Sequence, residues 1–295
     1  MFIVDSYPLA VLFCFITMMC WGSWGNTQKL ASREWRYELF YWDYVIGMFL
    51  FSLLISFTMG SFGSGGRHFI DDLGVGLSLV LGTVINYIGA PKGDPVILFA
   101  GVALIVVAVI CNGIASSKMQ REGADPHSSR KGILLAIIAG VLMSFFYRFV
   151  AAAMDLDSFA APAAGKLTPY SAIFIFSVGV LVSNLLFNSL AMHYPFAGAM
   201  VTYGEYFKGR PKTHLVGMLG GAVWCLGTAF SYIASGKAGA AISYALGQGA
   251  PMVAAIWGVF IWKEFKGASK GVYALLAVMF LLFVSGLGLI IASGY

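Results

Sequence analysis

The sequence predicts an all-α protein that crosses a membrane several times. Of its 295 residues, 59% are hydrophobic and 11% are charged, whereas an ordinary soluble domain has about a quarter charged residues. Nine apolar runs are each long enough to cross a hydrocarbon layer, which takes roughly 17–25 helical residues. The basic residues lie in short connectors between these runs. We therefore assign the net charge of +5 to membrane topology and not to nucleic-acid binding.

The predicted spans follow one another with short connectors that are rich in turn residues. No Lys or Arg precedes Lys29, so the first span is expected to be a permanent helix and not a cleaved signal peptide. The four cysteines lie inside apolar runs and lack the spacing of a metal site. We expect the nine spans at residues 7–25, 38–60, 73–90, 95–116, 131–154, 170–194, 214–235, 239–262 and 270–293.

The two halves of the chain repeat each other in order. In the first half Gly47 is followed by Ser52 and Ser56, and in the second half Gly179 is followed by Asn184 and Asn188 at the same offsets of five and nine. Weak but ordered matches of this kind are typical of the inverted repeats of transporters. We predict an N-terminal repeat at 1–116, a connector at 117–131 and a C-terminal repeat at 132–295.

The spacing within the two repeats is unequal. Gly47 lies 27 residues before Gly74, whereas the matching Gly179 and Gly247 are 68 residues apart. The second repeat fits a whole additional helix, 214–235, into this interval. The pattern therefore predicts a five-plus-five inverted-repeat fold from which the third helix is missing.

The charges of the connectors test this arrangement independently. With one extra crossing placed between residues 60 and 76, Arg67, Lys92, Lys166 and Lys237 lie on one side and 13 basic residues lie on the other. The positive-inside rule then puts the connector 117–131 in the cytoplasm and both termini outside the cell inner (plasma) membrane. The 13 residues are Lys29, Arg33, Arg36, Lys118, Arg121, Arg130, Lys131, Lys208, Arg210, Lys212, Lys263, Lys266 and Lys270.

Several separated motifs resemble one family of transporters. They are Phe2-Ile3-Val4-Asp5-Ser6, Trp21-Gly22-Ser23-Trp24, Asp43-Tyr44, Gly82-Thr83-Val84-Ile85-Asn86-Tyr87, Tyr170-Ser171-Ala172-Ile173-Phe174, Trp257-Gly258 and Glu264. Together they resemble the ureide permease family of the drug/metabolite transporter superfamily, as a bacterial-type member. The chain is similar, more weakly, to the glucose/ribose and rhamnose porters of that superfamily.

The resemblance implies ten helices and proton-linked uptake of a small polar solute, such as a ureide, a nucleobase or a related purine-breakdown product. The family's third helix would fall between Leu73 and Gly74, where this chain has none. The phosphate-binding loop of the plant members is absent from 117–131, so no nucleotide cofactor is expected. The alternatives are a sugar:proton symporter of the same superfamily and a truncated membrane protein that does not transport.

No enzymatic constellation is found in the sequence. The four histidines lie in or beside connectors, and no helix contains paired carboxylates. We therefore predict no enzyme activity, no metal and no cofactor. The expected partners are the solute, protons and the lipid bilayer, and a homodimer is compatible with this organisation.

Polar residues inside the predicted helices form the candidate site, because each is costly in hydrocarbon without a partner or water. Asp43 is the candidate for proton coupling, since a carboxyl desolvated there can hold a proton. The alternative is an interfacial acid that reaches the cytoplasm beside aromatic residues. Gln248 is a candidate for solute binding, because Gly247, Gly249 and Pro251 can break the helix around it. The alternative there is close helix packing by small residues.

Five further residues are assigned to the solute. Arg148, which follows Tyr147 in an apolar run, is either a cation for solute oxygens or a side chain that snorkels to the outer face. Asn184 shares a helix face with Asn188, where solute binding competes with helix–helix hydrogen bonding. Trp21 and Trp224 can stack on a planar ring, and Tyr147 completes the candidate set.

Overall fold

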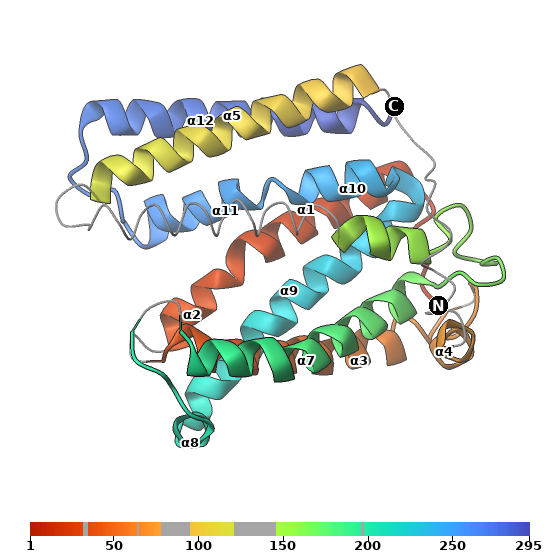
Figure 1. The fold of residues 1–295 in the computed structure, drawn as a ribbon. Helices are drawn as coiled ribbons and strands as arrows, with labels where there is room; N and C mark the ends of the chain where they lie inside the picture. Colours follow the sequence, from red (N-terminus) through yellow and green to blue (C-terminus); the bar gives the residue numbers. More distant parts are fainter. Residues whose placement is uncertain (32–34, 64, 78–94, 121–145, 196–197) are drawn as a thin grey trace.

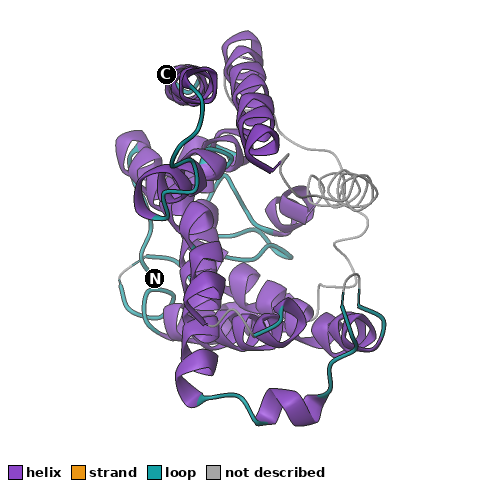
Figure 2. Cartoon of the chain, turned by 90° about the vertical axis from the view of Figure 1, so that its left-hand side faces the viewer, coloured by secondary structure: helices purple, strands orange, loops and turns teal. Residues whose placement is uncertain are grey.

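A computed structural model of the chain describes residues 1–31, 35–63, 65–77, 95–120, 146–195 and 198–295. The regular elements in these ranges are helices, and one isolated β-bridge joins Met154 to Leu167 (Figure 2). Within these described ranges, six candidate spans are long and apolar enough to cross a membrane. The prediction of an all-α, multi-pass membrane protein is therefore confirmed.

The helix boundaries lie close to the ends of the predicted apolar runs. Proline occupies the first turn of α1, α7, α9 and α11, where its missing N–H costs no hydrogen bond. A further helical segment covers residues 146–153. The elements are α1 (Tyr7–Ser23), α2 (Gly25–Ala31), α3 (Tyr37–Phe57), α4 (Phe69–Leu77), α5 (Pro95–Gln120), α7 (Pro169–His193), α8 (Tyr203–Phe207), α9 (Pro211–Ala238), α10 (Ala240–Gly247), α11 (Ala250–Ile256), the π-helix η1 (Trp257–Ile261) and α12 (Lys270–Ala292).

The bundle has two distinct ends (Figure 1). At the terminal end, the Met1 ammonium group donates to the Gly65 carbonyl at 2.6 Å, and the Tyr7 hydroxyl donates to the Ile291 carbonyl at 2.8 Å. At the opposite end, which we call the α8 end, Lys29 pairs with Glu264 at 2.5 Å. Connectors with many basic residues therefore meet at the α8 end, and both termini meet at the other.

Helix α3 ends, and helix α5 begins, at the terminal end of the bundle. Met59, just after α3, accepts a backbone hydrogen bond from Phe2, and Gly101 near the start of α5 packs against Gly286 near the end of α12. Of the span predicted at 73–90, the structure describes only the part that belongs to α4. The remainder lies outside the described residues, as does most of the span predicted at 131–154.

Helix α3 lies behind α7 in the view of Figure 1, and it packs against both α7 and α9. Its contact with α9 is close enough that backbone meets backbone. A Cβ added at Gly47 would collide with the Met218 backbone, and one added at Gly221 would collide with the Tyr44 backbone. Gly179, which matches Gly47 in the repeat, is exposed and has no neighbour within 4 Å among the described residues.

Helices α3 and α7 exchange reciprocal side-chain hydrogen bonds. The Ser56 hydroxyl donates to the carbonyl of Tyr170, the second residue of α7, at 3.0 Å. The Asn188 amide donates to the carbonyl of Glu38, the second residue of α3, at 2.9 Å. Both donors lie nine residues after the matching glycines Gly47 and Gly179. Asn188 therefore joins two helices, which is one of the two roles weighed for the asparagine pair.

The glycine contacts predict different outcomes for two matching substitutions. Gly47→Leu should destabilise the detergent-purified protein by at least about 2 kcal/mol, because the new side chain overlaps the α9 backbone. Gly179→Leu should change stability little, since that position is open. Thermal unfolding of both variants beside the wild type checks this. Equal losses for the two variants would contradict the described α3–α9 contact.

Candidate functional site

Asp43 lies at the centre of a polar cluster at the α8 end. Its side chain has no exposed surface. The Tyr206 hydroxyl donates to Oδ1 at 2.7 Å, and Nδ1 of His214 lies 2.7 Å from the same oxygen. The Trp35 indole N–H donates to Oδ2 at 3.2 Å. We call these four residues the Asp43 cluster.

The cluster forms because four segments converge at the α8 end. Asp43 lies in the second turn of α3, His214 in the first turn of α9, Tyr206 in the short helix α8 and Trp35 just before α3. Gly217 of α9 packs directly against the Asp43 side chain, so a larger residue there would displace the carboxylate. A buried carboxylate is tolerated only when its oxygens are hydrogen-bonded, and this arrangement supplies three partners.

The protein surroundings also act on Tyr206. Burial, its hydrogen bond to Asp43 and the nearby Asp43 charge all raise the pKa of Tyr206. Its hydroxyl therefore stays protonated at physiological pH and remains a donor to the carboxylate. Arg36 and Glu38, the charged residues nearest to Asp43 in the sequence, form an ion pair with each other at 2.7 Å.

A second group of side chains forms an aromatic cluster inside the bundle. Trp21 and Trp224 are nearly parallel, with centroids 6.3 Å apart and an interplanar angle of 16°. The ring centroid of Tyr244 lies 6.2 Å from that of Trp21 and 4.8 Å from that of Tyr147. Most of these rings are only partly buried although they lie between helices. The aromatic cluster consists of Trp21, Tyr44, Phe146, Tyr147, Phe176, Trp224 and Tyr244.

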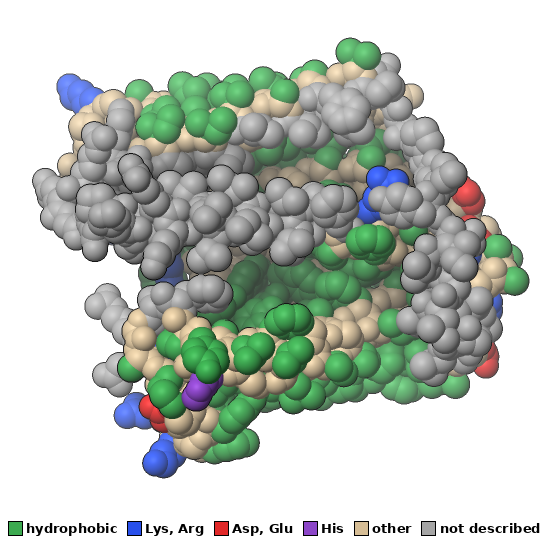
Figure 3. Space-filling model, in the orientation of Figure 1, with side chains coloured by type: hydrophobic (Ala, Val, Ile, Leu, Met, Phe, Trp, Pro, Cys, Tyr) green, Lys and Arg blue, Asp and Glu red, His purple; other side chains and the backbone are tan. Residues whose placement is uncertain are grey.

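Hydroxyl groups accompany the aromatic cluster. The Trp21 indole N–H donates to Oγ1 of Thr228 at 3.0 Å. The Tyr147 hydroxyl lies 3.0 Å from Oγ of Ser231, which in turn lies 3.0 Å from Oγ of Ser243. Figure 3 shows the molecule hollowed between its two layers, with apolar side chains inside the hollow. The bundle thus combines aromatic faces with a few polar groups, as small-molecule sites commonly do.

The helix predicted at 239–262 is broken, and the break lies where Gly247, Gly249 and Pro251 weaken a helix. Helix α10 ends at Gly247 and α11 begins at Ala250, with Gln248 exposed between them. Gln248 lies four residues after Tyr244, so both share one helix face. Close packing is present as well, because a Cβ added at Gly247 would meet the Trp21 ring 2.7 Å away.

Two candidate residues lie apart from the aromatic cluster. Arg148 is exposed, whereas its neighbour Tyr147 is buried. Asn184 is 3% exposed and lies eight residues after Phe176, about 12 Å further along α7. Within the described part of the chain, neither atom of its carboxamide has a hydrogen-bond partner. The structure therefore groups Trp21, Trp224, Tyr147 and Gln248 and leaves the other two outside.

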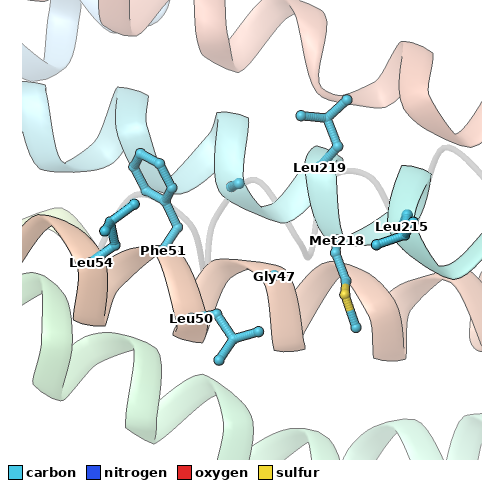
Figure 4. A pocket seen from close by; sticks show the side chains of 8 residues that line it. Gly47, Leu50, Phe51, Leu54, Leu215, Met218 and Leu219 are labelled. Carbon is cyan, nitrogen blue, oxygen red and sulfur yellow. The ribbon is translucent and has the colours of Figure 1, made fainter.

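A groove of about 340 Å³ between α3 and α9 does not suit a polar solute (Figure 4). Its lining is wholly apolar, and several of its leucines, such as Leu54 at 56% and Leu215 at 65%, are largely exposed. Such a surface faces lipid in a membrane protein. We therefore place the candidate site at the aromatic cluster and the Asp43 cluster.

Sequence reasoning missed several residues of these clusters. His214 was interpreted as a connector residue, and Tyr206, Trp35 and Tyr244 were given no role. His214 lies 171 positions from Asp43. Only the charge pattern of the connectors, which puts both residues toward the same side, could have suggested that they meet.

Comparisons with known proteins decide the family. The profile described as ureide permease matches residues 124–293, more than half of the chain. The chain belongs to the ureide permease family. It is 22% identical to ureide permease 1 of Arabidopsis thaliana, with 99% of both chains covered, and 23% identical to ureide permease 2 at the same coverage. Ureide permease 5 is 24% identical, with 99% of this chain and 96% of the relative covered.

The family membership has two immediate consequences. Members of the ureide permease family are transporters, so this chain is a membrane transporter and not an enzyme. Its alignment with ureide permease 1 spans 391 positions against 295 residues, so at least 96 positions have no counterpart in this chain. No solved structure matches the chain.

Proposed function

We propose that this ureide permease family member is a secondary active transporter that moves a small planar solute, of the ureide or nucleobase class, together with protons. Membership of the ureide permease family supports a role in the transport of small polar metabolites. The observation that carries the solute class is the aromatic cluster beside the broken helix α10–α11. The relatives are named ureide permeases, and we propose the same class of solute for this chain.

The aromatic cluster suits a planar ring. Flat heterocycles and ureides stack on indole and phenol faces, and stacked pairs contribute about 0.5–1.5 kcal/mol beyond the burial of their area. Trp21 and Trp224 come from opposite repeats and expose part of their surface inside the bundle. A solute held between such faces would contact both halves of the transporter at once.

Gln248 supplies the polar recognition in this proposal. A carboxamide offers a donor and an acceptor, which pair with the alternating N–H and C=O groups of ureides and nucleobases. Its position at the end of α10 also places the solute beside a discontinuous helix, where transporters commonly bind their substrates. Tyr147 and its hydroxyl neighbours Ser231 and Ser243 add further polar contacts.

Asp43 is proposed as the coupling acid. It is buried, it lies within a membrane span, and its carboxylate is bound by ionisable and polar partners. The next residue, Tyr44, belongs to the aromatic cluster, since its ring lies 6.4 Å from that of Trp224. A change in the charge of Asp43 can therefore affect the solute site through Tyr44, the adjacent residue of α3.

The inverted repeat is also part of the proposal. The reciprocal hydrogen bonds of Ser56 and Asn188, at matching positions of α3 and α7, support it. So does the pairing of α5 with α12, the last predicted helices of the two halves. We propose repeats at 1–116 and 132–295, with 117–131 on the cytoplasmic side together with the α8 end.

The missing third helix leaves one face of α7 open in this arrangement. Helix α9 covers α3 at Gly47, whereas none of the described helices covers α7 at Gly179 in the same way. We propose that the described clusters suffice for transport without such a helix. The contrary view, a truncated protein that does not transport, is an outcome of the following experiment.

Uptake into proteoliposomes tests the function. We expect labelled uracil or allantoin to accumulate when the outside is more acidic than the inside, and glucose to remain outside. Trp224→Ala should raise the KM about two- to tenfold through the loss of stacking, whereas Phe260→Ala on the exposed face of η1 should not. Uptake of glucose alone would favour the sugar symporter, and uptake of no solute would contradict the proposal.

Cysteine labelling in intact cells tests the orientation. Ala160 is exposed at the terminal end and Lys208 at the α8 end. In a cysteine-free background, Ala160→Cys should react with an impermeant maleimide, whereas Lys208→Cys should react only after the cells are permeabilised. The reverse pattern would overturn the proposed orientation, and identical labelling of the two sites would contradict the two-ended bundle.

A further inference from the structure

We propose that His214 is the relay through which protons pass between water at the α8 end and the Asp43 carboxylate. This inference rests on the proposed function of Asp43 as the coupling acid. It adds a residue on another helix, 171 positions away, and assigns it a step that Asp43 cannot perform alone.

Asp43 has no direct contact with water. Its side chain has no exposed surface, and its oxygens are bound by Tyr206, His214 and Trp35. The indole of Trp35 does not ionise, and burial holds the pKa of Tyr206 above the physiological range. Histidine is the side chain that ordinarily exchanges protons near neutral pH. A proton that reaches or leaves Asp43 at this end must therefore pass through the imidazole of His214.

His214 has the two-sided placement that a relay needs. Nδ1 faces Oδ1 of Asp43 at 2.7 Å, and the side chain is 20% exposed. The other nitrogen, Nε2, faces Gly209 in the loop between α8 and α9. A side chain at position 209 would press against Nε2, so the glycine keeps this edge of the ring open.

The transfer balances without a further reactant. A proton from water binds Nε2 of the neutral imidazole whose Nδ1–H is donated to Asp43. The Nδ1 proton then moves to Oδ1, which leaves a neutral carboxyl group and an imidazole protonated on Nε2. Exchange of the imidazole protons with water then restores the tautomer protonated on Nδ1, so each passage delivers one proton to Asp43.

Among the residues that the structure describes, few other charges surround the pair. Helix α8 presents the Tyr206 hydroxyl, α9 presents Gly217, and the segment before α3 presents Trp35. Arg36 and Glu38 of the neighbouring turn are paired with each other. The exposed side chains of Arg210 and Lys212, at the start of α9, face solvent. Of the described partners of Asp43, His214 is thus the group placed to exchange protons with it.

Transport by variants in proteoliposomes tests the relay. His214→Gln keeps an N–H donor for Asp43, so exchange of solute without net proton movement should stay within about twofold of the wild type. Accumulation driven by a pH gradient should fall at least about tenfold, because the proton path is cut. Added imidazole should restore part of the accumulation in His214→Ala. His193→Gln, an exposed histidine at the same end, should behave as the wild type.

Tryptophan fluorescence tests the same step without transport. The rings of Trp35 and His214 meet edge to face at 5.2 Å, and a protonated imidazole quenches a neighbouring indole. The contribution of Trp35, obtained by difference from Trp35→Phe, should fall as the pH is lowered. His214→Gln should abolish this dependence, and His193→Gln should not.

The two readouts separate the relay from the function on which it rests. Wild-type protein that accumulates no solute would refute the proposed transport, and the fluorescence titration would still decide whether His214 exchanges protons. A pH-independent Trp35 signal in the wild type would overturn the relay. So would full proton-driven accumulation by His214→Gln.

Discussion

One end of this transporter depends on the hydrogen bonds of the buried Asp43 carboxylate. An unpaired charge in an apolar interior costs several kcal/mol, so each partner of Asp43 must stay in place while the carboxylate is ionised. Those partners come from the segment before α3, from α8 and from α9. The short helix α8 has no buried residue of its own. Its place in the bundle therefore rests on contacts such as the one between Tyr206 and Asp43.

The same interaction links proton binding to packing. Protonation would remove the charge that holds Tyr206 and Trp35, whereas the glycine contacts between α3 and α9 would remain. Asp43 is thus a place where one proton can loosen a set of contacts without separating the two helices. Tyr44, the next residue, meets the aromatic cluster, so the loosened contacts lie next to the region proposed for the solute.

Much of the fold could be predicted from the sequence, because hydrocarbon imposes simple rules. Helix α9 was predicted at 214–235 and runs over Pro211–Ala238, and the break after Gly247 lies where glycine and proline weaken the helix. Asp43 was a candidate because a carboxyl is costly in a membrane span. The sequence also indicated Trp21, Trp224, Tyr147 and Gln248, which the structure brings together.

Other features were beyond sequence reasoning for physical reasons. The contact between His214 and Asp43 depends on how α9 crosses α3, and glycine spacing alone does not specify that crossing. In the sequence, Tyr244 is one more aromatic residue in an apolar run. Its place in the aromatic cluster is known only from the distances between its ring and those of Trp21 and Tyr147. The helix α8 is too short for a hydrophobic period to reveal.

The central claim is that Asp43 carries the proton that moves with the solute. The most direct measurement is the electrical current evoked when an uncharged solute is added to proteoliposomes on a solid support at equal pH on both sides. The account predicts a current in the wild type and none in Asp43→Asn, although this variant still exchanges labelled for unlabelled solute. An undiminished solute-evoked current in Asp43→Asn would contradict the account.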